Sequence, residues 1–435
     1  MTTRKASSRK AASKVTLSEA NLRIANLFRQ PAETATERED LDRPLDPGIE
    51  ISGDERAHKI ALRIDGVEVS WCSIVDFRQQ IGPCLVRMGG LAGVGTHDDH
   101  RFKGYSRRVL LNMLRWLRQA GYDVTMLYGI PGFYPKFGYA EAFPNVSHSI
   151  LVRDAELAQP GNYRFVDFDE RKHFSAALEM YRDNNAGRTG PTAREEGRWA
   201  PFRKGSVWGP RPMVQVALDP RGRPAGYIAY DGAQHVDGVI LEAGYASPAV
   251  FGSLLREAAG WAWVHRWERF KFLLPEDHAF LNYCRQFGMV REMTFRRDGG
   301  AMVRMIDIAG AMRKISPLLA ARLSVAAGGD GARGAGGKSS SGGKAGSLLI
   351  RTNLGDARLA WRGGKVSVSA SARPAKRGDE WVNLPQWALA QLLYGYRDVA
   401  SLAAEGELRG TKAGLAALAA MFPPGPHFHY RIDTF

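Results

Sequence analysis

The order of the predicted elements occurs twice along the chain, and this repetition limits the possible folds more than any other feature. The first copy reads as a hairpin in "HKIALRIDGVEVSWCSIV", a strand in "PCLVRMGGLAGVGT", a helix, the strand "DVTMLYGI", and a short helix and strand in "GFYPKFGYAEA". The second reads as the hairpin "MVQVALDPRGRPAGYIAYDG", the strand "GVILEAGY", a helix from about Ser253 to Trp267, the strand "RFKFLLP" and "AFLNYCRQFGMV". The alternation predicts α/β domains with mixed sheets. Alignment of Phe137-Gly138 with Phe287-Gly288 indicates an internal duplication.

The segment "HRFKGYSRRVLLNML" places a basic loop directly before a helix in the first copy. Apolar residues at helical spacing predict that this helix begins near Gly104. Its first-turn amides and its dipole form an anion site suited to phosphate, and Arg101 and Lys103 add positive charge. The alternative is an ordinary helix start with a solvated basic face. The second copy has no arginine–glycine pair in "EAGYASPAVFGSLL", and it has Cys284 where the first has Tyr134. We therefore expect one competent copy and one structural copy.

The net charge of +15 raises the question of a nucleic-acid partner. The first fourteen residues contribute +5 and the glycine-rich stretch 328–346 contributes +2, which leaves +8 for the rest of the chain. No recognisable nucleic-acid module accompanies this charge, so acidic small ligands or solubility explain it better than a specific nucleic-acid partner. No apolar run is long enough for a membrane span, and the basic N-terminus lacks the apolar region of a secretory signal. With three cysteines in neither metal-ligand nor disulfide spacing, a cytoplasmic protein is expected.

The two ends of the chain differ in character from the duplicated part. Residues 1–16 are small, polar and basic and predict disorder, and the next few residues predict a short helix. Nine of the nineteen residues in 328–346 are glycine, which predicts a flexible linker or loop. Beyond it, alternating strand patterns and two helical segments predict a small α+β domain, and the chain closes on the strand-like "HFHYRI" followed by "DTF".

The pattern Arg101-x-x-Gly104-x-Ser106, between a strand and a helix and followed by "GFYPKFGY", resembles the acyl-CoA N-acyltransferase (GNAT) superfamily loop that wraps the pyrophosphate of acetyl-CoA. The usual pattern ends on Gly or Ala, so Ser106 is a mild departure. The three-part chain, with "NNAGRTGPTAREEGRWAPF" and "LPQWALAQLLYGYRD…DTF", resembles the Eis (enhanced intracellular survival) acetyltransferases. The resemblance implies two GNAT folds in tandem, the second degenerate, and a sterol-carrier-like domain that starts near Ile306. The expected boundaries are a tail and short helix at 1–40, a catalytic domain at 41–155, a degenerate domain at 156–306 and a C-terminal domain at 307–435.

The resemblance also implies an activity, that of an acetyl-CoA-dependent N-acetyltransferase (EC 2.3.1 class) acting on a polyamine, an aminoglycoside-like molecule or a lysine side chain. Tyr134 matches the family's general acid, and the terminal carboxylate of Phe435 matches its base. The oxyanion donor is expected from strand amides near Val94 to Thr96. Acetyl-CoA is expected at Val94, Thr96, Arg101, Phe102, Lys103, Gly104, Tyr105 and Ser106. No metal is required, and the family's hexamers imply a homo-oligomer.

Several alternatives stay open at this point. Tyr134 could pack under the sheet, and Phe435 could be a frayed end. The run His97 to His100 has the composition of a metal cluster, although its adjacency suits a cap between strand and loop. Trp199, Trp208 and Phe202 could line an acceptor pocket or pack in a core. A second function is a lipid-binding protein that uses the sterol-carrier-like domain, with the acetyltransferase folds as scaffold.

Overall fold

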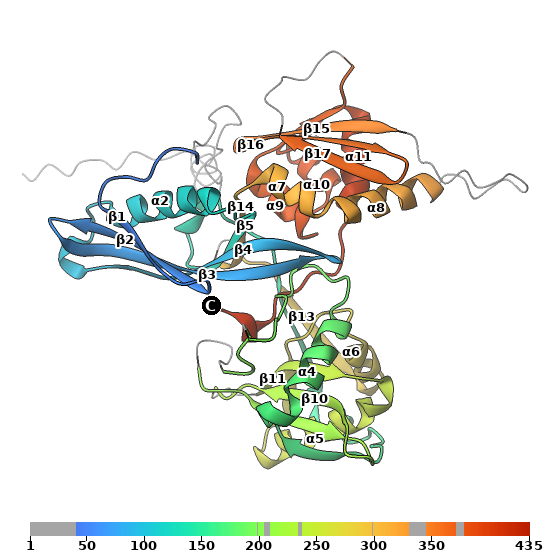
Figure 1. The fold of residues 1–435 in the computed structure, drawn as a ribbon. Helices are drawn as coiled ribbons and strands as arrows, with labels where there is room; N and C mark the ends of the chain where they lie inside the picture. Colours follow the sequence, from blue (N-terminus) through green and yellow to red (C-terminus); the bar gives the residue numbers. More distant parts are fainter. Residues whose placement is uncertain are drawn as a thin grey trace, which may run out of the picture.

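The computed structural model describes residues 41–197, 199–203, 209–233, 237–297, 299–329, 345–370 and 378–435. The predicted basic tail, the short helix after it, Trp208 and most of the glycine-rich stretch lie outside these residues. The described chain forms two seven-stranded sheets and one five-stranded sheet, each with its own helices (Figure 1).

The first sheet contains the first predicted hairpin, and the structure confirms it. Asp65 and Gly66, with φ of 51° and 80°, form the turn between two antiparallel strands, as the twist of a tight hairpin requires. In sheet order the strands are β1 (Ile49–Gly53), β2 (Ala57–Ile64), β3 (Val67–Ile81), β4 (Cys84–Thr96), β5 (Val124–Gly129), β14 (Gly300–Met305) and β6 (Ala140–Glu141). The edge strand β1 was not predicted from the sequence. The helix α2 (Tyr105–Gln119) covers one face and buries its apolar stripe there (Figure 1).

The second sheet repeats the strand order of the first. Its strands are β8 (Arg164–Asp167), β9 (Met213–Leu218), β10 (Pro224–Tyr230), β11 (Gly238–Tyr245), β12 (Arg269–Phe272), β7 (Asn145–Leu151) and β13 (Met289–Thr294). The sixth position of each sheet is filled from the other half of the chain: β14 follows the second copy in sequence but pairs with β5, and β7 follows the first copy but pairs with β12. The duplicated halves therefore exchange one strand, which ties the two sheets together.

Four helices accompany the second sheet among the described residues, namely α3 (Val152–Ala155), α4 (Glu170–Asn184), α5 (Phe251–Val264) and α6 (Ala279–Cys284). The helix α5 corresponds to the helix predicted from about Ser253 to Trp267, whereas α3 and α4 were not predicted. A 3-10 turn that ends in Phe-Gly occurs in both copies, at Tyr134–Phe137 and at Arg285–Phe287, and the following Gly138 and Gly288 have φ of 73° and 75°. The positive φ explains the glycine in each copy. Tyr134 and Cys284 each lie three residues before the phenylalanine of this turn, and this shared position is the basis for the predicted correspondence between them.

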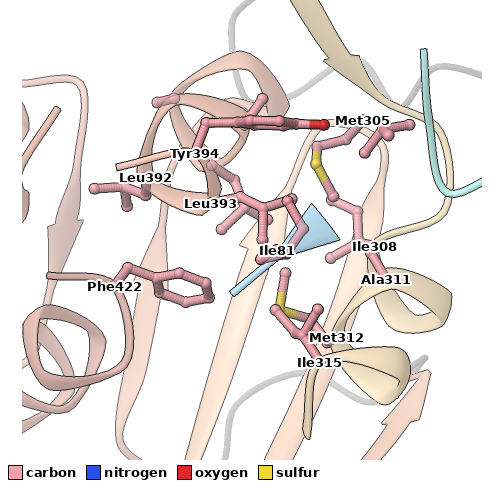
Figure 2. Packing of buried hydrophobic residues seen from close by; sticks show 14 of the residues in the cluster. Ile81, Met305, Ile308, Ala311, Met312, Ile315, Leu392, Leu393, Tyr394 and Phe422 are labelled. Carbon is pink, nitrogen blue, oxygen red and sulfur yellow. The ribbon is translucent and has the colours of Figure 1, made fainter. Parts of the chain in front are cut away.

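The third sheet belongs to the C-terminal part of the chain, as the alternating strand patterns predicted. Its strands are β17 (Lys365–Ala370), β16 (Gly355–Arg362), β15 (Gly346–Thr352), β18 (Trp381–Asn383) and β19 (Arg409–Gly410). Its helices are α7 (Ile308–Lys314), α8 (Ser316–Gly329), α9 (Gln386–Leu393), α10 (Val399–Ala404) and α11 (Lys412–Met421). Side chains of α7 and α9 pack with Ile81 of the first sheet in one buried cluster, as Figure 2 shows. This cluster covers the sheet face opposite to α2.

The last residues of the chain do not form the predicted strand. His427 makes only an isolated bridge to Thr189, and a 3-10 turn follows at Arg431–Asp433. The segment runs from the C-terminal domain into the space between the first two sheets (Figure 1). Alternating side chains contact different domains. Phe428, Tyr430 and Ile432 pack in the core of the second sheet, whereas the rings of His427 and His429 lie against Phe143, which packs in the same core as Phe435. The alternation thus reflects packing between two domains, which mimics a strand pattern in sequence.

Candidate active site

A gap between two parallel strands defines the centre of the first sheet. The pairing of β4 with β5 ends at Gly90 and Met126, although β4 continues to Thr96 and β5 to Gly129. Beyond that point the two strands diverge. Backbone groups along a diverging pair are free to bind an extended polar ligand between the strands, as an added strand would.

A bulge in β4 lies beside this gap. Trp71 pairs with Gly95 and Ser73 pairs with Ala92, so the single residue Cys72 faces both Gly93 and Val94. Gly93 has φ of 55°, which bends the strand and turns its backbone away from the regular ladder. Val94 is half-buried, and the hydroxyl of Thr96 lies 2.9 Å from that of Ser70. The bulge places Val94 and Thr96, both predicted from the sequence, along the diverging part of β4.

The predicted phosphate loop lies at the N-terminus of α2. Gly104 is the N-cap residue with φ of 77°, as the sequence predicted for the start of this helix. Phe102 also has a positive φ, 62°, and its side chain is fully exposed, which is an unfavourable conformation and location for a phenylalanine. Arg101 is exposed and pairs with Asp98 at 2.9 Å, Lys103 is exposed, and Tyr105 and Ser106 are half-buried in the first turn. The loop presents basic side chains and first-turn amides together.

Tyr134 opens the 3-10 turn after β5 and lies against the end of that strand. A Cβ at Gly129 would lie 2.8 Å from Sδ of Met302 and 3.0 Å from Cδ2 of Tyr134, so the glycine allows these side chains to pack closely against the strand. The ring packs edge-on against Phe133 and Tyr139. Burial, with a smaller contribution from Cys72, raises the pKa of the Tyr134 phenol above its usual value. The phenol therefore keeps its proton at neutral pH, as a proton donor must.

Phe435 lies over the point where β4 and β5 separate. Its side chain is buried, and its ring contacts Phe77 of β3 and Tyr128 of β5 at centroid distances of 5.4 and 6.1 Å. A Cβ at Gly90 would lie 2.7 Å from Cγ of Phe435, so this position must be glycine for the ring to fit. The C-terminal residue is therefore docked and not frayed. It lies against Gly90, the last residue of β4 that pairs with β5.

A buried ion cluster holds the residues just before this terminus. Nε and Nη2 of Arg194 each donate to a carboxylate oxygen of Asp433 at 3.1 Å, and Nη1 donates to Oε1 of Glu242 at 2.8 Å. All three side chains are at most 3 % exposed. The Tyr227 hydroxyl donates to Glu242 at 2.7 Å, and the guanidinium lies 3.6 Å from the Tyr181 ring centroid. Burial raises the pKa of Asp433 and the Arg194 charge opposes that rise, so the carboxylate depends on this one cation.

The position of Glu242 connects this cluster to the duplication. β11 pairs with β12 only from Gly238 to Ile240, and then the strands diverge, as β4 and β5 do in the first sheet. Glu242 lies just beyond the point where the strands diverge. Its carboxylate accepts from Arg194, which also donates to Asp433 of the C-terminal segment. In the second copy, therefore, Arg194 links the residue just beyond the divergence to Asp433 of the C-terminal segment. Sequence reasoning missed Arg194, Glu242 and Asp433, because only their burial together, over a long sequence separation, distinguishes them from surface charges.

A cavity of about 270 Å³ adjoins the terminus on the side of β3. It is lined by side chains of β3, of the segment 192–203 and of residues 432–434. Trp199 lines it, whereas Phe202 is buried in the second core. A smaller cavity of about 140 Å³ lies on the other side of the terminus, beside Tyr128 and His429.

The residues from His97 to His100 have separate neighbours. His97 packs against Trp71, Asp98 pairs with Arg101, and the His100 ring lies 6.1 Å from that of Tyr105. Within the residues that the structure describes, no group of three or more His, Cys, Asp or Glu side chains is arranged to hold a metal ion. Among the same residues, no helix is both long and apolar enough to cross a membrane.

Comparison with protein families identifies two parts of the chain. Residues 19–142 match the acetyltransferase (GNAT) domain, and residues 349–429 match the sterol carrier protein domain. The first match begins before the described residues and includes β1 to β6; the second covers most of the third sheet and its helices. No curated protein matches the chain by sequence.

Solved structures share the whole arrangement at low sequence identity. A conserved protein of unknown function from Enterococcus faecalis V583, described as a probable N-acyltransferase, has a TM-score of 0.67 at 15% identity over 87% of this chain and 89% of its own. A GCN5-related N-acetyltransferase from Kribbella flavida has a TM-score of 0.63 at 17% identity over 87% of each chain. Eis1 from Mycobacterium abscessus has a TM-score of 0.57 at 15% identity over 87% of this chain and 90% of its own.

The fold and the domain matches together define a GNAT-type acyltransferase architecture with two acetyltransferase folds in tandem. The chain contains an acetyltransferase domain of the GNAT type, a second copy of that fold and a C-terminal sterol carrier protein domain.

Proposed function

We propose that the chain is an acetyl-CoA-dependent N-acetyltransferase whose active site lies at the gap between β4 and β5. The observation that carries this proposal is the docking of Phe435 against Gly90, the residue at which the pairing of β4 with β5 ends, in a domain whose helix α2 begins with a basic, glycine-capped loop. The extended arm of acetyl-CoA would lie along the diverging strands, with its pyrophosphate at the first turn of α2. In this proposal the eight cofactor-binding residues predicted from the sequence would contact the cofactor along this path.

The reaction needs one proton acceptor and one proton donor. The amine nitrogen bonds to the acetyl carbon, and an amide of the β4 bulge near Val94 stabilises the developing oxyanion. The carbon–sulfur bond then breaks, and the sulfur keeps its electron pair. The Tyr134 phenol gives its proton to the sulfur, and the terminal carboxylate of Phe435 takes the proton that leaves the amine. Solvent returns both groups to their starting states.

The lipid-binding alternative receives less support. The buried apolar side chains of α7 and α9 are packed with Ile81 of β3 and Met305 of β14, so these side chains are not available to a lipid (Figure 2). Gln386 and Gln391 of α9 also donate to the backbone oxygens of Gly138 and Glu141, which fixes this helix on the first domain. We therefore infer that α9 stabilises the first domain, which contains the proposed acetyltransferase site, and does not bind a lipid. A homo-oligomer and a cytoplasmic location stay predictions from the sequence.

The experiment that tests the proposed activity is Tyr134→Phe. The variant should bind acetyl-CoA with unchanged affinity, because the ring packing against Gly129 remains, while kcat falls by about 10²-fold or more with the loss of the proton donor. Calorimetry measures the affinity, and thiol release from acetyl-CoA in the presence of a panel of amines measures kcat. The matched control is Tyr163→Phe in the second domain, which should leave both values unchanged. Wild-type turnover in the Tyr134 variant would make this residue a packing residue.

A second experiment tests the phosphate loop. Gly104→Glu together with Arg101→Ala should weaken acetyl-CoA binding by at least about 10²-fold, since it removes one cation and adds an anion beside the pyrophosphate. Gly121→Glu is a close control: Gly104 and Gly121 lie next to opposite ends of α2 with φ of 77° and 76°, and a Cβ would meet nothing within 4 Å at either. The backbone strain is therefore matched, and only the double variant should lose affinity. Equal affinities in the two proteins would refute the loop assignment.

A further inference from the structure

The cavity of about 270 Å³ beside the C-terminal segment has an uneven distribution of charge. Its lining includes four arginines and three carboxylates, namely Arg56, Arg78, Arg194, Arg203, Asp76, Glu195 and Asp433. Two of the carboxylates are buried and already paired. Asp433 is held by Arg194, and Asp76 is 2 % exposed and lies 2.7 Å from Arg87 and 3.3 Å from Arg78.

Three of the four arginines, in contrast, are at least partly exposed to solvent. Arg56 and Arg203 are exposed, and about a third of the Arg78 side chain is exposed. Nη2 of Arg56 donates to the backbone oxygen of Gly197 at 2.7 Å, and the exposed carboxylate of Asp54 accepts from the backbone N–H of Arg56 at 2.8 Å. Among the residues that the structure describes, no carboxylate forms an ion pair with Arg56 or Arg203. With the half-buried Glu195 included, the four arginines of the lining exceed its carboxylates by one charge, so the lining has a net positive charge.

Residues close to the C-terminus form part of the cavity lining. Ile432, Asp433 and Thr434 line it, and Phe435 follows with its terminal carboxylate. Under the proposed function the terminal carboxylate takes a proton from the amine, so an acceptor in this cavity would have that carboxylate toward one end and the exposed arginines toward the other. Such a field favours a molecule with the same polarity, a positive or proton-losing amine at one end and an anion at the other. A polyamine or an aminoglycoside would place further cations beside the three arginines, which is unfavourable.

We infer that the cavity lined by Arg56, Arg78 and Arg203 is the acceptor site, and that it selects amines that also carry a carboxylate or a phosphate. This inference rests on the proposed acetyltransferase function and narrows its acceptor. Guanidinium groups suit both anions, because their paired N–H donors match the oxygens of a carboxylate or of a phosphate. Phe77 and Trp199 provide apolar walls for the chain between the two ends.

The test compares acceptors that differ in charge and little in length. Thiol release from acetyl-CoA is measured with γ-aminobutyrate, aminoethyl phosphate, butylamine and diaminobutane. In the wild-type protein kcat/KM should be at least about tenfold higher for an anionic amine than for diaminobutane. The two anionic arms separate a carboxylate acceptor from a phosphate acceptor. In the double variant Arg56→Glu/Arg203→Glu, diaminobutane should become a better acceptor than the anionic amines. The control is Arg362→Glu, at the end of β16 in the C-terminal domain, which should leave the preference of the wild-type protein unchanged.

The possible outcomes separate this inference from the proposed function. Equal or faster transfer to diaminobutane overturns the inference and leaves the acetyltransferase intact. The inference is also overturned if the protein binds acetyl-CoA, as measured by calorimetry, but transfers the acetyl group to neither of the two anionic amines. A retained preference in the doubly reversed variant would do the same, because the arginines would then not be its cause. If calorimetry detects no binding of acetyl-CoA to the wild-type protein, the proposed acetyltransferase function itself is contradicted.

Discussion

Conversion of the terminal carboxylate of Phe435 to a carboxamide, by ligation of a synthetic C-terminal peptide, is expected to lower kcat by about 10²- to 10⁴-fold. The change removes the negative charge and the proton acceptor but keeps the aromatic ring. The ring contacts with Phe77 and Tyr128 and the close approach to Gly90 therefore remain, so the folded structure should be retained. Acetyl-CoA affinity should also be unchanged, since the phosphate loop is untouched.

The carboxamide is a sharper test than a deletion. Removal of Phe435 would empty a buried site and cost about 3–5 kcal/mol of stability, as truncation of a core phenylalanine does, which would confuse loss of the base with loss of packing. The control is the same ligation with the natural carboxylate. A thermal melt confirms that both proteins fold alike. Full turnover in the carboxamide protein would place the base elsewhere, with Asp98, Asp99 and Glu141 as the remaining carboxylates to test.

Replacement of Arg194 by methionine is expected to have the largest effect on stability. The substitution leaves the Asp433 and Glu242 carboxylates buried together without a cation. Removal of one partner from such a buried cluster typically costs about 3–5 kcal/mol in the free energy of unfolding. The carboxylates can avoid that cost by protonation or by release of the C-terminal segment. Because Asp433 lies two residues before Phe435, release of the segment would also lower acetyl transfer.

Chemical denaturation and thiol release measure the two effects on the same protein. Arg223→Met is the control, since it removes a guanidinium from an exposed pair with Asp219 and should cost less than about 1 kcal/mol. We expect a clear shift in the denaturation midpoint and a loss of activity for Arg194→Met only. If the midpoints of the two variants agree, the buried cluster does not hold the C-terminal segment. Glu242→Gln should have an intermediate effect, because Asp433 then keeps its cation.

The sequence by itself determined the local elements of the site. The spacing of apolar residues from Val109 to Leu117 predicted α2, and the glycine before it predicted the turn at Gly104, because both depend on short-range backbone geometry. The hairpin at Asp65-Gly66 and the paired Phe-Gly turns were recognisable for the same reason. The family resemblance added roles for Tyr134 and Phe435, which no local pattern contains.

Only the tertiary structure decided how these elements are joined. The exchange of β7 and β14 between the two sheets is invisible in the sequence, because a strand's alternation is the same whichever sheet it completes. The sequence also predicted a strand for the last residues, where alternating side chains in fact contact two different cores. Arg194, Glu242 and Asp433 lie far apart in the chain, and each reads as an ordinary surface charge. Their burial together, and the place of Phe435 at Gly90, follow from the packing of three domains around one short segment.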